Sequence, residues 1–182
     1  MRKGQFISTF SGTKFWPADP RQNEIKIEDI AHALSLLCRG NGHVAHFYSV
    51  AQHSLYCAYE AKKRKYSHKV QLACLLHDGS EAYISDITRP VKKLLPLYRE
   101  MELNLQNAIE KKYGLVDLTE VEQKQVKEID DAILRYELAE LLDTHDYNAL
   151  ELVGDYDFSF RMMADVEKEF LDLFHELRES IA

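Results

Sequence analysis

The chain has 182 residues and a mass of 21.2 kDa, which suits a single domain over residues 1–182. Gly and Pro together make up about 6% of the residues against an average near 12%, which disfavours a many-stranded β protein and favours an all-α fold. The formal charge of −7 argues against a nucleic acid polymer as partner, and no apolar run is long enough to span a bilayer. Residues 1–10 lack the apolar core of a secretory signal, so we expect a cytoplasmic protein with no membrane partner.

The first predicted element is a short N-terminal β-hairpin. Residues 6–10 alternate apolar and polar side chains, Ser11-Gly12 favours a turn, and residues 14–16 supply the second strand. From Ile27 the apolar residues change to helical spacing, and the glycines of residues 39–42 end this helix.

The rest of the chain is predicted to be helical. Ser49 is a good N-cap for a helix over residues 50–65, and the next helix, residues 67–83, is apolar on nearly all sides, which is typical of a central helix. Further helices are expected up to about residue 112 with a break near Pro96 and a stop at Gly114, from about residue 118 onward, and over residues 159–180.

Ionisable residues interrupt the most apolar helix. His77 and Asp78 lie within it, and Glu81 follows one turn later. Burial of such groups costs several kcal/mol for each uncompensated ion, by order of magnitude. A divalent cation would compensate that cost, and a buried His-Asp hydrogen bond with a purely structural role is the alternative.

Two more polar residues interrupt apolar stripes. His53 has apolar residues one turn before and after it, and so does Asp130. Asp131 has Lys127 four residues before it and Arg135 four residues after it, which is typical of a solvent-facing carboxylate with helical ion pairs. We therefore expect Asp130 to point inward and Asp131 outward.

Three helices would then direct two imidazoles and two carboxylates toward one point. This set suits Zn, Co, Mn or Fe, and it leaves coordination positions for water and substrate. The three cysteines form no CxxC pair and each lies in an apolar pattern, so we expect reduced core residues rather than ligands or disulfides at Cys38, Cys57 and Cys74.

The order His53, His77-Asp78, Asp130 resembles the H…HD…D signature of the HD-domain metal-dependent phosphohydrolases. Residues 77–92 are similar to the HD-x-S-E-x-x-x-x-D-x-x-x-P-x-K stretch of one branch, which contains bacterial 5′-deoxynucleotidases and phage enzymes that act on deoxyadenosine triphosphate. The resemblance covers about residues 27–142. It implies an HD-domain helical bundle that removes phosphate or triphosphate from a deoxynucleotide (dNMP or dNTP, deoxyadenylates included), with a metal-activated water attacking phosphorus.

The resemblance also implies roles for individual residues. The metal ligands would be His53, His77, Asp78 and Asp130. Proton transfer or water orientation would fall to Glu81 and Asp86. Substrate would be bound by Arg39, Arg89, Pro90 and Lys92. Three alternatives stay open: Glu81 only orients a ligand, Asp86 caps a helix, and Lys92 lies on a solvated basic face.

The sequence departs from the family pattern at Gly40, where relatives commonly carry an aromatic residue that stacks on the base. Other aromatic residues are candidates to replace it, namely Phe15, Trp16, Phe47 and Tyr48. The expected partner is a small-molecule nucleotide, with Mg as a second ion if that nucleotide is a triphosphate, and we expect a homo-oligomer. Hydrolysis of a signalling nucleotide and non-catalytic nucleotide binding are the competing functions.

Overall fold

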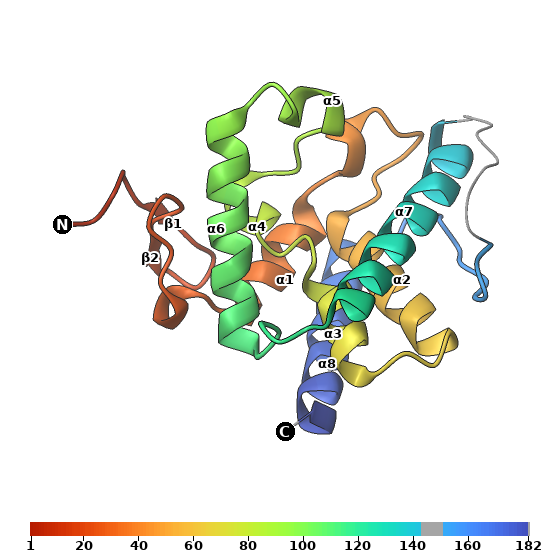
Figure 1. Cartoon of the computed structure of the whole chain (residues 1–182). Helices are drawn as coiled ribbons and strands as arrows, with labels where there is room; N and C mark the ends of the chain where they lie inside the picture. Colours follow the sequence, from red (N-terminus) through yellow and green to blue (C-terminus); the bar gives the residue numbers. More distant parts are fainter. Residues whose placement is uncertain (143–150, 182) are drawn as a thin grey trace.

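The structure is a computed structural model that describes residues 1–142 and 151–181 (Figure 1). The polypeptide folds mainly into helices, as the composition predicts. Two short strands precede the helices, β1 (Ile7–Ser8) and β2 (Lys14–Phe15). The helices follow in the order η1 (Gln22–Glu24), α1 (Ile27–Leu36), η2 (Arg39–Gly42), α2 (Val50–Lys63), α3 (His68–Leu76), α4 (Glu81–Ile84), α5 (Arg89–Lys92), α6 (Pro96–Tyr113), α7 (Glu120–Leu142) and α8 (Met163–Ile181).

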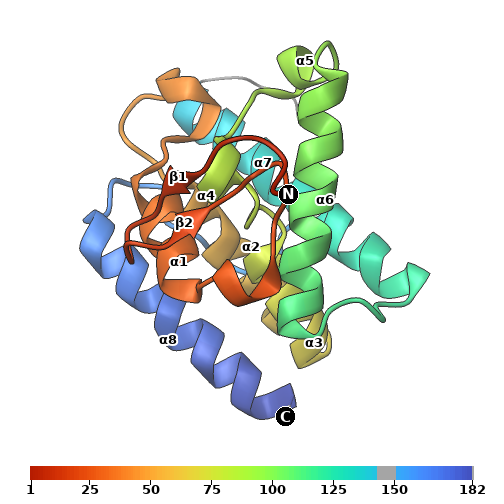
Figure 2. The same cartoon turned by 90° about the vertical axis from the view of Figure 1, so that its left-hand side faces the viewer.

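The predicted N-terminal hairpin is confirmed. β1 and β2 pair antiparallel, with Ile7 opposite Phe15, and the hairpin lies over α1 and α4 (Figure 2). Asp29 of α1 is buried and accepts hydrogen bonds from the backbone N–H of Ser11 (2.6 Å) and from its hydroxyl (2.9 Å). The Phe15 ring stacks on Tyr83 of α4 with 4.0 Å between centroids. These contacts fix the hairpin to the helices that lead to the site.

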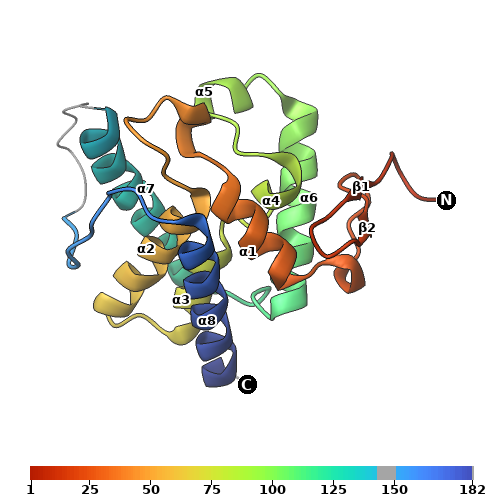
Figure 3. The ribbon, with the colours of Figure 1, turned by 180° about the vertical axis from the view of Figure 1, so that it is seen from behind.

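Helix α2 packs against α3, α7 and α8, while α1 lies beside α8 (Figure 3). The predicted N-cap is confirmed because Ser49 Oγ accepts from the backbone N–H of Gln52 at 3.1 Å. Helix α8 begins at Met163 rather than at the expected residue 159. Its buried side chains recur every three or four residues and form the apolar stripe Val166, Phe170, Leu173, Phe174 and Leu177.

The expected single helix over residues 67–83 is wrong, because a turn separates α3 from α4. Gly79 lies in this turn, and a Cβ there would approach Leu76 O to 3.0 Å and Ile109 Cδ1 to 3.3 Å. The carbonyl of Leu76 and the side chain of Ile109 on α6 thus favour glycine at this position. As a result His77 stands at the C-terminal end of α3 instead of inside a longer helix.

The remaining helix ends match the sequence signals. Pro96 opens α6, and Gly114 adopts the left-handed conformation (φ 75°) that ends it. Across residues 1–142 and 151–181, no helix combines the length and the apolar character needed to cross a bilayer.

Candidate metal centre and adjoining pocket

Four side chains from α2, the end of α3, the following turn and α7 converge on one point. His53 Nε2 lies 3.3 Å from His77 Nε2, 3.2 Å from Asp130 Oδ1 and 3.8 Å from Asp78 Oδ2. His77 Nε2 lies 3.3 Å from Asp78 Oδ2 and 3.6 Å from Asp130 Oδ1. The structure thus brings together all four residues that the sequence predicts as metal ligands.

The tautomers of both histidines leave their Nε2 atoms free to accept. His53 Nδ1 lies 2.6 Å from a carboxylate oxygen of Glu137, and His77 Nδ1 lies 2.7 Å from the carbonyl oxygen of Cys74. Carboxylate and carbonyl oxygens only accept hydrogen bonds, so Nδ1 is the donor in both rings. Two Nε2 atoms and two carboxylate oxygens therefore face one another, and such a set needs either protons on the Nε2 atoms or a cation between its members.

The geometry fits a transition metal. Ligand atoms about 2.0–2.2 Å from one ion lie about 3.0–3.5 Å from each other, close to the separations observed here. Cys57 Sγ lies 3.6 Å from His53 Nε2, so a thiol borders the same point. Burial raises the pKa of Cys57 well above its ordinary value, and Asp130 raises it further. The carboxylates are therefore the readier ligands.

Without a metal, the four groups stabilise one another as ion pairs. Burial opposes the charge on His77, but Asp78 and Asp130 raise its pKa well above the ordinary value. Burial likewise opposes ionisation of the two aspartates, but the histidines lower the pKa of Asp78 and of Asp130. The site thus holds its carboxylates ionised, which is the form that binds a cation.

The adjacent aspartates of α7 point in different directions, as predicted. Asp131 binds Lys127 Nζ at 2.7 Å and Arg89 Nη1 at 2.9 Å. Asp130 directs Oδ1 at the histidines and Oδ2 at Arg89 Nη2, 3.0 Å away. Arg89 therefore bridges the two aspartates, a contact that the helical spacing of Lys127 and Arg135 does not reveal.

A cavity of about 360 Å³ opens beside the convergence point. Predicted site residues line it: Arg39, Asp78, Glu81, Asp86, Arg89, Pro90, Lys92 and Asp130. Aliphatic side chains line it as well: Val44, Ile87, Leu134, Leu138, Leu141 and Leu142. One pocket thus joins charged groups to an apolar wall, as in many small-molecule sites.

Arg39 enters the pocket from the loop between α1 and α2. Its backbone N–H donates to Tyr48 O at 2.8 Å, which clamps the loop just before α2 begins. Its guanidinium is largely buried, with Nη1 3.4 Å from Asp78 Oδ2 and 3.7 Å from Asp86 Oδ2. The N-cap of α5 is Thr88, so the alternative that Asp86 caps a helix is wrong. Arg39 is thus a predicted phosphate-binding residue that is largely buried next to the candidate ligand Asp78.

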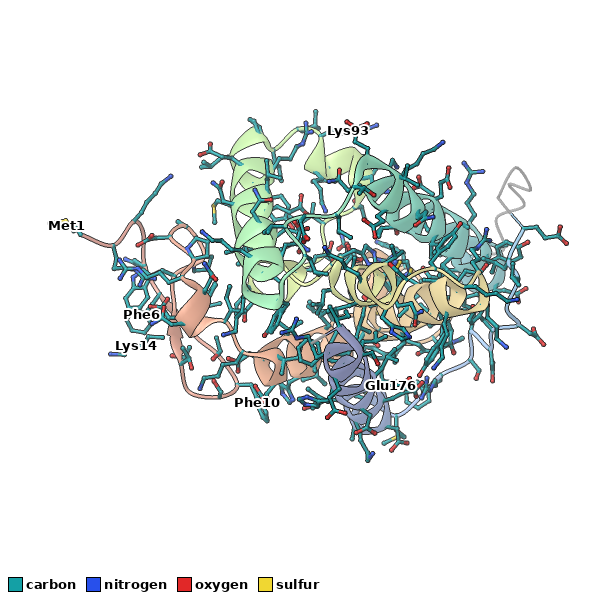
Figure 4. All side chains as sticks on the ribbon, turned by 60° about the horizontal axis from the view of Figure 1, so that its bottom comes forward. Met1, Phe6, Phe10, Lys14, Lys93 and Glu176 are labelled. Carbon is teal, nitrogen blue, oxygen red and sulfur yellow. The ribbon has the colours of Figure 1, made fainter. Side chains whose placement is uncertain are left out.

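The other predicted cations are engaged in ion pairs. Lys92 Nζ lies 2.5 Å from Glu102 Oε1 and 3.6 Å from Glu81 Oε1, so it is not simply part of a solvated basic face. The next residue, Lys93, is not one of the predicted site residues and lies at the outer edge of the molecule (Figure 4). Arg89 and Lys92 thus form the pocket rim while neutralising acidic neighbours.

Glu81 is a buried carboxyl at the pocket wall. Its side chain is 4% exposed, and Oε2 has no hydrogen-bond partner among the residues that the structure describes. Burial raises the pKa of Glu81 well above its ordinary value, and the nearby Asp78 and Asp86 raise it further. This group is placed to carry a proton beside the metal ligands.

The sequence reasoning missed Glu137. It lies on α7 two turns after Asp130, is 3% exposed, and contacts His53, Tyr48 and Arg39. Glu137 interrupts the apolar stripe that carries Ile133, and an interruption of the same kind identified Asp130, so the sequence contained a signal for Glu137.

None of the four aromatic residues considered as replacements at Gly40 lines the pocket. Phe15 and Tyr48 are fully buried, Tyr48 with its hydroxyl on Glu137, and Trp16 packs against Phe6 and Arg2. The pocket wall beside Gly40 is aliphatic instead, through Val44 and the leucines of α7.

The fold and site define a helical protein with a largely buried two-histidine, two-aspartate cluster beside a mixed charged and apolar pocket. No family model matches the chain. The chain is 31% identical over 153 residues to the uncharacterized protein RCAP_rcc00048 of Rhodobacter capsulatus, covering 81% of this chain and 78% of that protein, and it belongs to the same family. It is 44% identical over 110 residues to the uncharacterized protein YfdR of Escherichia coli, where the match spans 60% of this chain and 59% of YfdR. Neither name states an activity.

Proposed function

We propose that this protein is a metal-dependent phosphohydrolase that acts on deoxynucleotides. The observation that carries the proposal is the convergence of His53, His77, Asp78 and Asp130 next to a pocket that Arg39 enters. A divalent cation held there would supply a Lewis acid for the phosphoryl group and would activate water. The resemblance of residues 77–92 to the HD-domain phosphohydrolases supports the same activity.

The residues of the chain would divide the remaining work. Arg39 presents a planar fork that suits a phosphate group. Glu81 lines the pocket and would transfer the proton to or from the reacting oxygens. Asp86 would help to position the Arg39 guanidinium through its contact with Nη1. The aliphatic wall would receive the apolar faces of the nucleoside.

The geometry favours a monophosphate over a triphosphate. The cavity volume of about 360 Å³ lies near the lower end of ligand-pocket sizes. Arg89 and Lys92, the cations expected to hold further phosphates, are already paired with Asp130, Asp131 and Glu102. Arg39 is paired as well, with Asp78, Asp86 and Glu137, so the preference for a monophosphate rests on the cavity volume.

Location and assembly are proposals as well. The described cysteines are free, which supports a reducing compartment such as the cytoplasm. Leucines exposed near α5 and along α6, among them Leu94, Leu97 and Leu103, support self-association.

A substrate panel tests the activity. Purified protein supplied with Mn, Co or Zn is offered all deoxy- and ribonucleotide mono-, di- and triphosphates, and the products are separated. We expect phosphate release from deoxynucleoside monophosphates, loss of at least about 10²-fold in turnover for Asp78→Ala, and retained turnover for the surface control Glu128→Ala. Turnover confined to a signalling nucleotide, or metal and nucleotide binding with no turnover, would overturn the proposal.

A further inference from the structure

Glu137 lies between two parts of the site that come from different elements. Its Oε1 accepts hydrogen bonds from His53 Nδ1 at 2.6 Å and from the Tyr48 hydroxyl at 2.9 Å. Its Oε2 lies 3.5 Å from Arg39 Nη2. Glu137 and Tyr48 are buried, and the Arg39 side chain is only 12% exposed, so solvent does not compete strongly for these contacts.

The contact with His53 decides which ring nitrogen faces the metal site. A carboxylate on Nδ1 requires the proton to reside there and leaves the Nε2 lone pair directed at His77 and Asp130. Such a carboxylate also holds the ring orientation and makes the imidazole a stronger ligand. The Tyr48 hydroxyl fixes the carboxylate in turn.

The second oxygen of Glu137 acts on the phosphate side. Arg39 Nη1 faces Asp78 and Asp86 while Nη2 faces Glu137, so acidic groups hold the guanidinium from both edges. A long side chain held in this way loses less conformational entropy when a phosphate arrives.

We propose that Glu137 is a positioning residue that holds His53 for the metal through Oε1 and Arg39 for phosphate through Oε2. This inference rests on the proposed metal site. In this proposal one carboxylate positions the metal ligand His53 and the phosphate-binding Arg39 relative to each other.

Two substitutions separate the two contacts. Glu137→Ala removes both. In Glu137→Gln the amide oxygen must face His53, because a metal on Nε2 requires a proton on Nδ1, and the amide NH₂ is then turned toward the Arg39 guanidinium. Two hydrogen-bond donors then face each other, so Arg39 loses its contact with residue 137 while His53 keeps its hydrogen bond to that residue. Glu140→Ala, an exposed glutamate on the same helix, is the matched control.

The test measures Co(II) affinity, the visible spectrum of bound Co(II), and the affinity of the loaded protein for inorganic phosphate. For Glu137→Ala we expect Co(II) affinity to fall roughly 10- to 100-fold with an altered spectrum. For Glu137→Gln we expect Co(II) affinity within about threefold of wild type, an unchanged spectrum, and phosphate affinity lowered roughly tenfold. Glu140→Ala should match wild type in all three.

The outcomes distinguish this inference from the proposed function. If the wild-type protein binds Co(II) and hydrolyses nucleotides while both Glu137 variants bind Co(II) and phosphate as it does, the positioning role is wrong and the function stands. If the wild type binds no metal, both fail. A purely structural role would lower the melting temperature of both variants without separating metal from phosphate affinity. If Glu137→Ala does not fold, Glu137→Gln decides alone, since equal loss of both affinities contradicts the proposal.

Discussion

Glu81 lies in an environment unlike that of an ordinary surface glutamate. It lines the pocket between Asp78 and Lys92, it is buried, and one of its oxygens lacks a partner among the described residues. An unsatisfied buried carboxyl oxygen costs about 1–3 kcal/mol or more, so its retention suggests a chemical use. If the protein is the proposed hydrolase, transfer of a proton is the use that the position of Glu81 next to the candidate metal ligands favours.

Glu81→Gln tests this use because the amide keeps the volume but carries no transferable proton. We expect turnover to fall roughly 10²- to 10⁴-fold while metal content stays at the wild-type value. The measurement is phosphate release with the metal that supports the wild type, together with metal analysis of the same sample. Full turnover in Glu81→Gln would exclude proton transfer by this residue, and loss of metal would assign it to the ligand set instead.

At the scale of elements, α2 both carries His53 and anchors the segment that leads into α8. Glu60 on α2 accepts hydrogen bonds from the backbone N–H groups of Val153 (2.9 Å) and Gly154 (3.0 Å) and from the Tyr156 hydroxyl (2.8 Å). Burial by itself raises the pKa of Glu60, but these hydrogen bonds and the one from Arg64 outweigh it and lower the pKa below its ordinary value. The ionised carboxylate thus stabilises the folded state.

The sign of the pH dependence follows from that lowered pKa. The stabilisation is fully present above the ordinary glutamate pKa of about 4.3 and is lost as the pH falls through the lower pKa of the folded state. We expect Glu60→Gln to cost about 1–3 kcal/mol of unfolding free energy at pH 7 and less at low pH. Urea unfolding at a series of pH values measures the difference in unfolding free energy between wild type and Glu60→Gln. A difference that stays constant as the pH falls below the lowered pKa of Glu60 would contradict the role given to the carboxylate.

At the scale of the whole molecule, local signals predicted the elements well. The hairpin turn, the Ser49 cap and the Gly114 stop each depend on side-chain or backbone chemistry within a few residues. The break after Leu76 was not predicted. Gly79 lies in it, and a Cβ there would be tight against Leu76 O and also against Ile109 of α6, a contact that the local pattern does not contain. Element boundaries that depend on distant packing are therefore the ones the sequence leaves undetermined.

The same distinction applies to the site. Periodicity alone placed His53 and Asp130 on inward faces, and it distinguished Asp130 from Asp131. The pairing of Lys92 with Glu102 on α6, and of Arg89 with α7, could not be predicted because the partners come from other elements. Glu137 is an intermediate case, since its place in the apolar stripe was visible but its contacts with the α1–α2 loop were not.

The net charge of the whole chain differs from the charge expected at the pocket once a metal is bound. The formal charge of −7 repels anions at a distance, but the candidate metal site gathers two carboxylates and two histidines, and a divalent cation would neutralise the carboxylates. With the cation and Arg39 in place, the pocket floor would attract a phosphate despite the acidic surface. Anion capture is therefore expected to depend on metal loading.

Metal stoichiometry measured by equilibrium dialysis, on wild type and on the adjacent variants Asp130→Ala and Asp131→Ala, tests this account most directly. We expect about one Co, Mn or Zn per chain in the wild type and in Asp131→Ala, and a loss of at least about tenfold in affinity in Asp130→Ala. The two aspartates share a helix and differ in direction, so the pair controls for charge and for helix stability. A wild-type protein that stays far below one metal per chain, or equal metal binding by all three proteins, would contradict the metal centre.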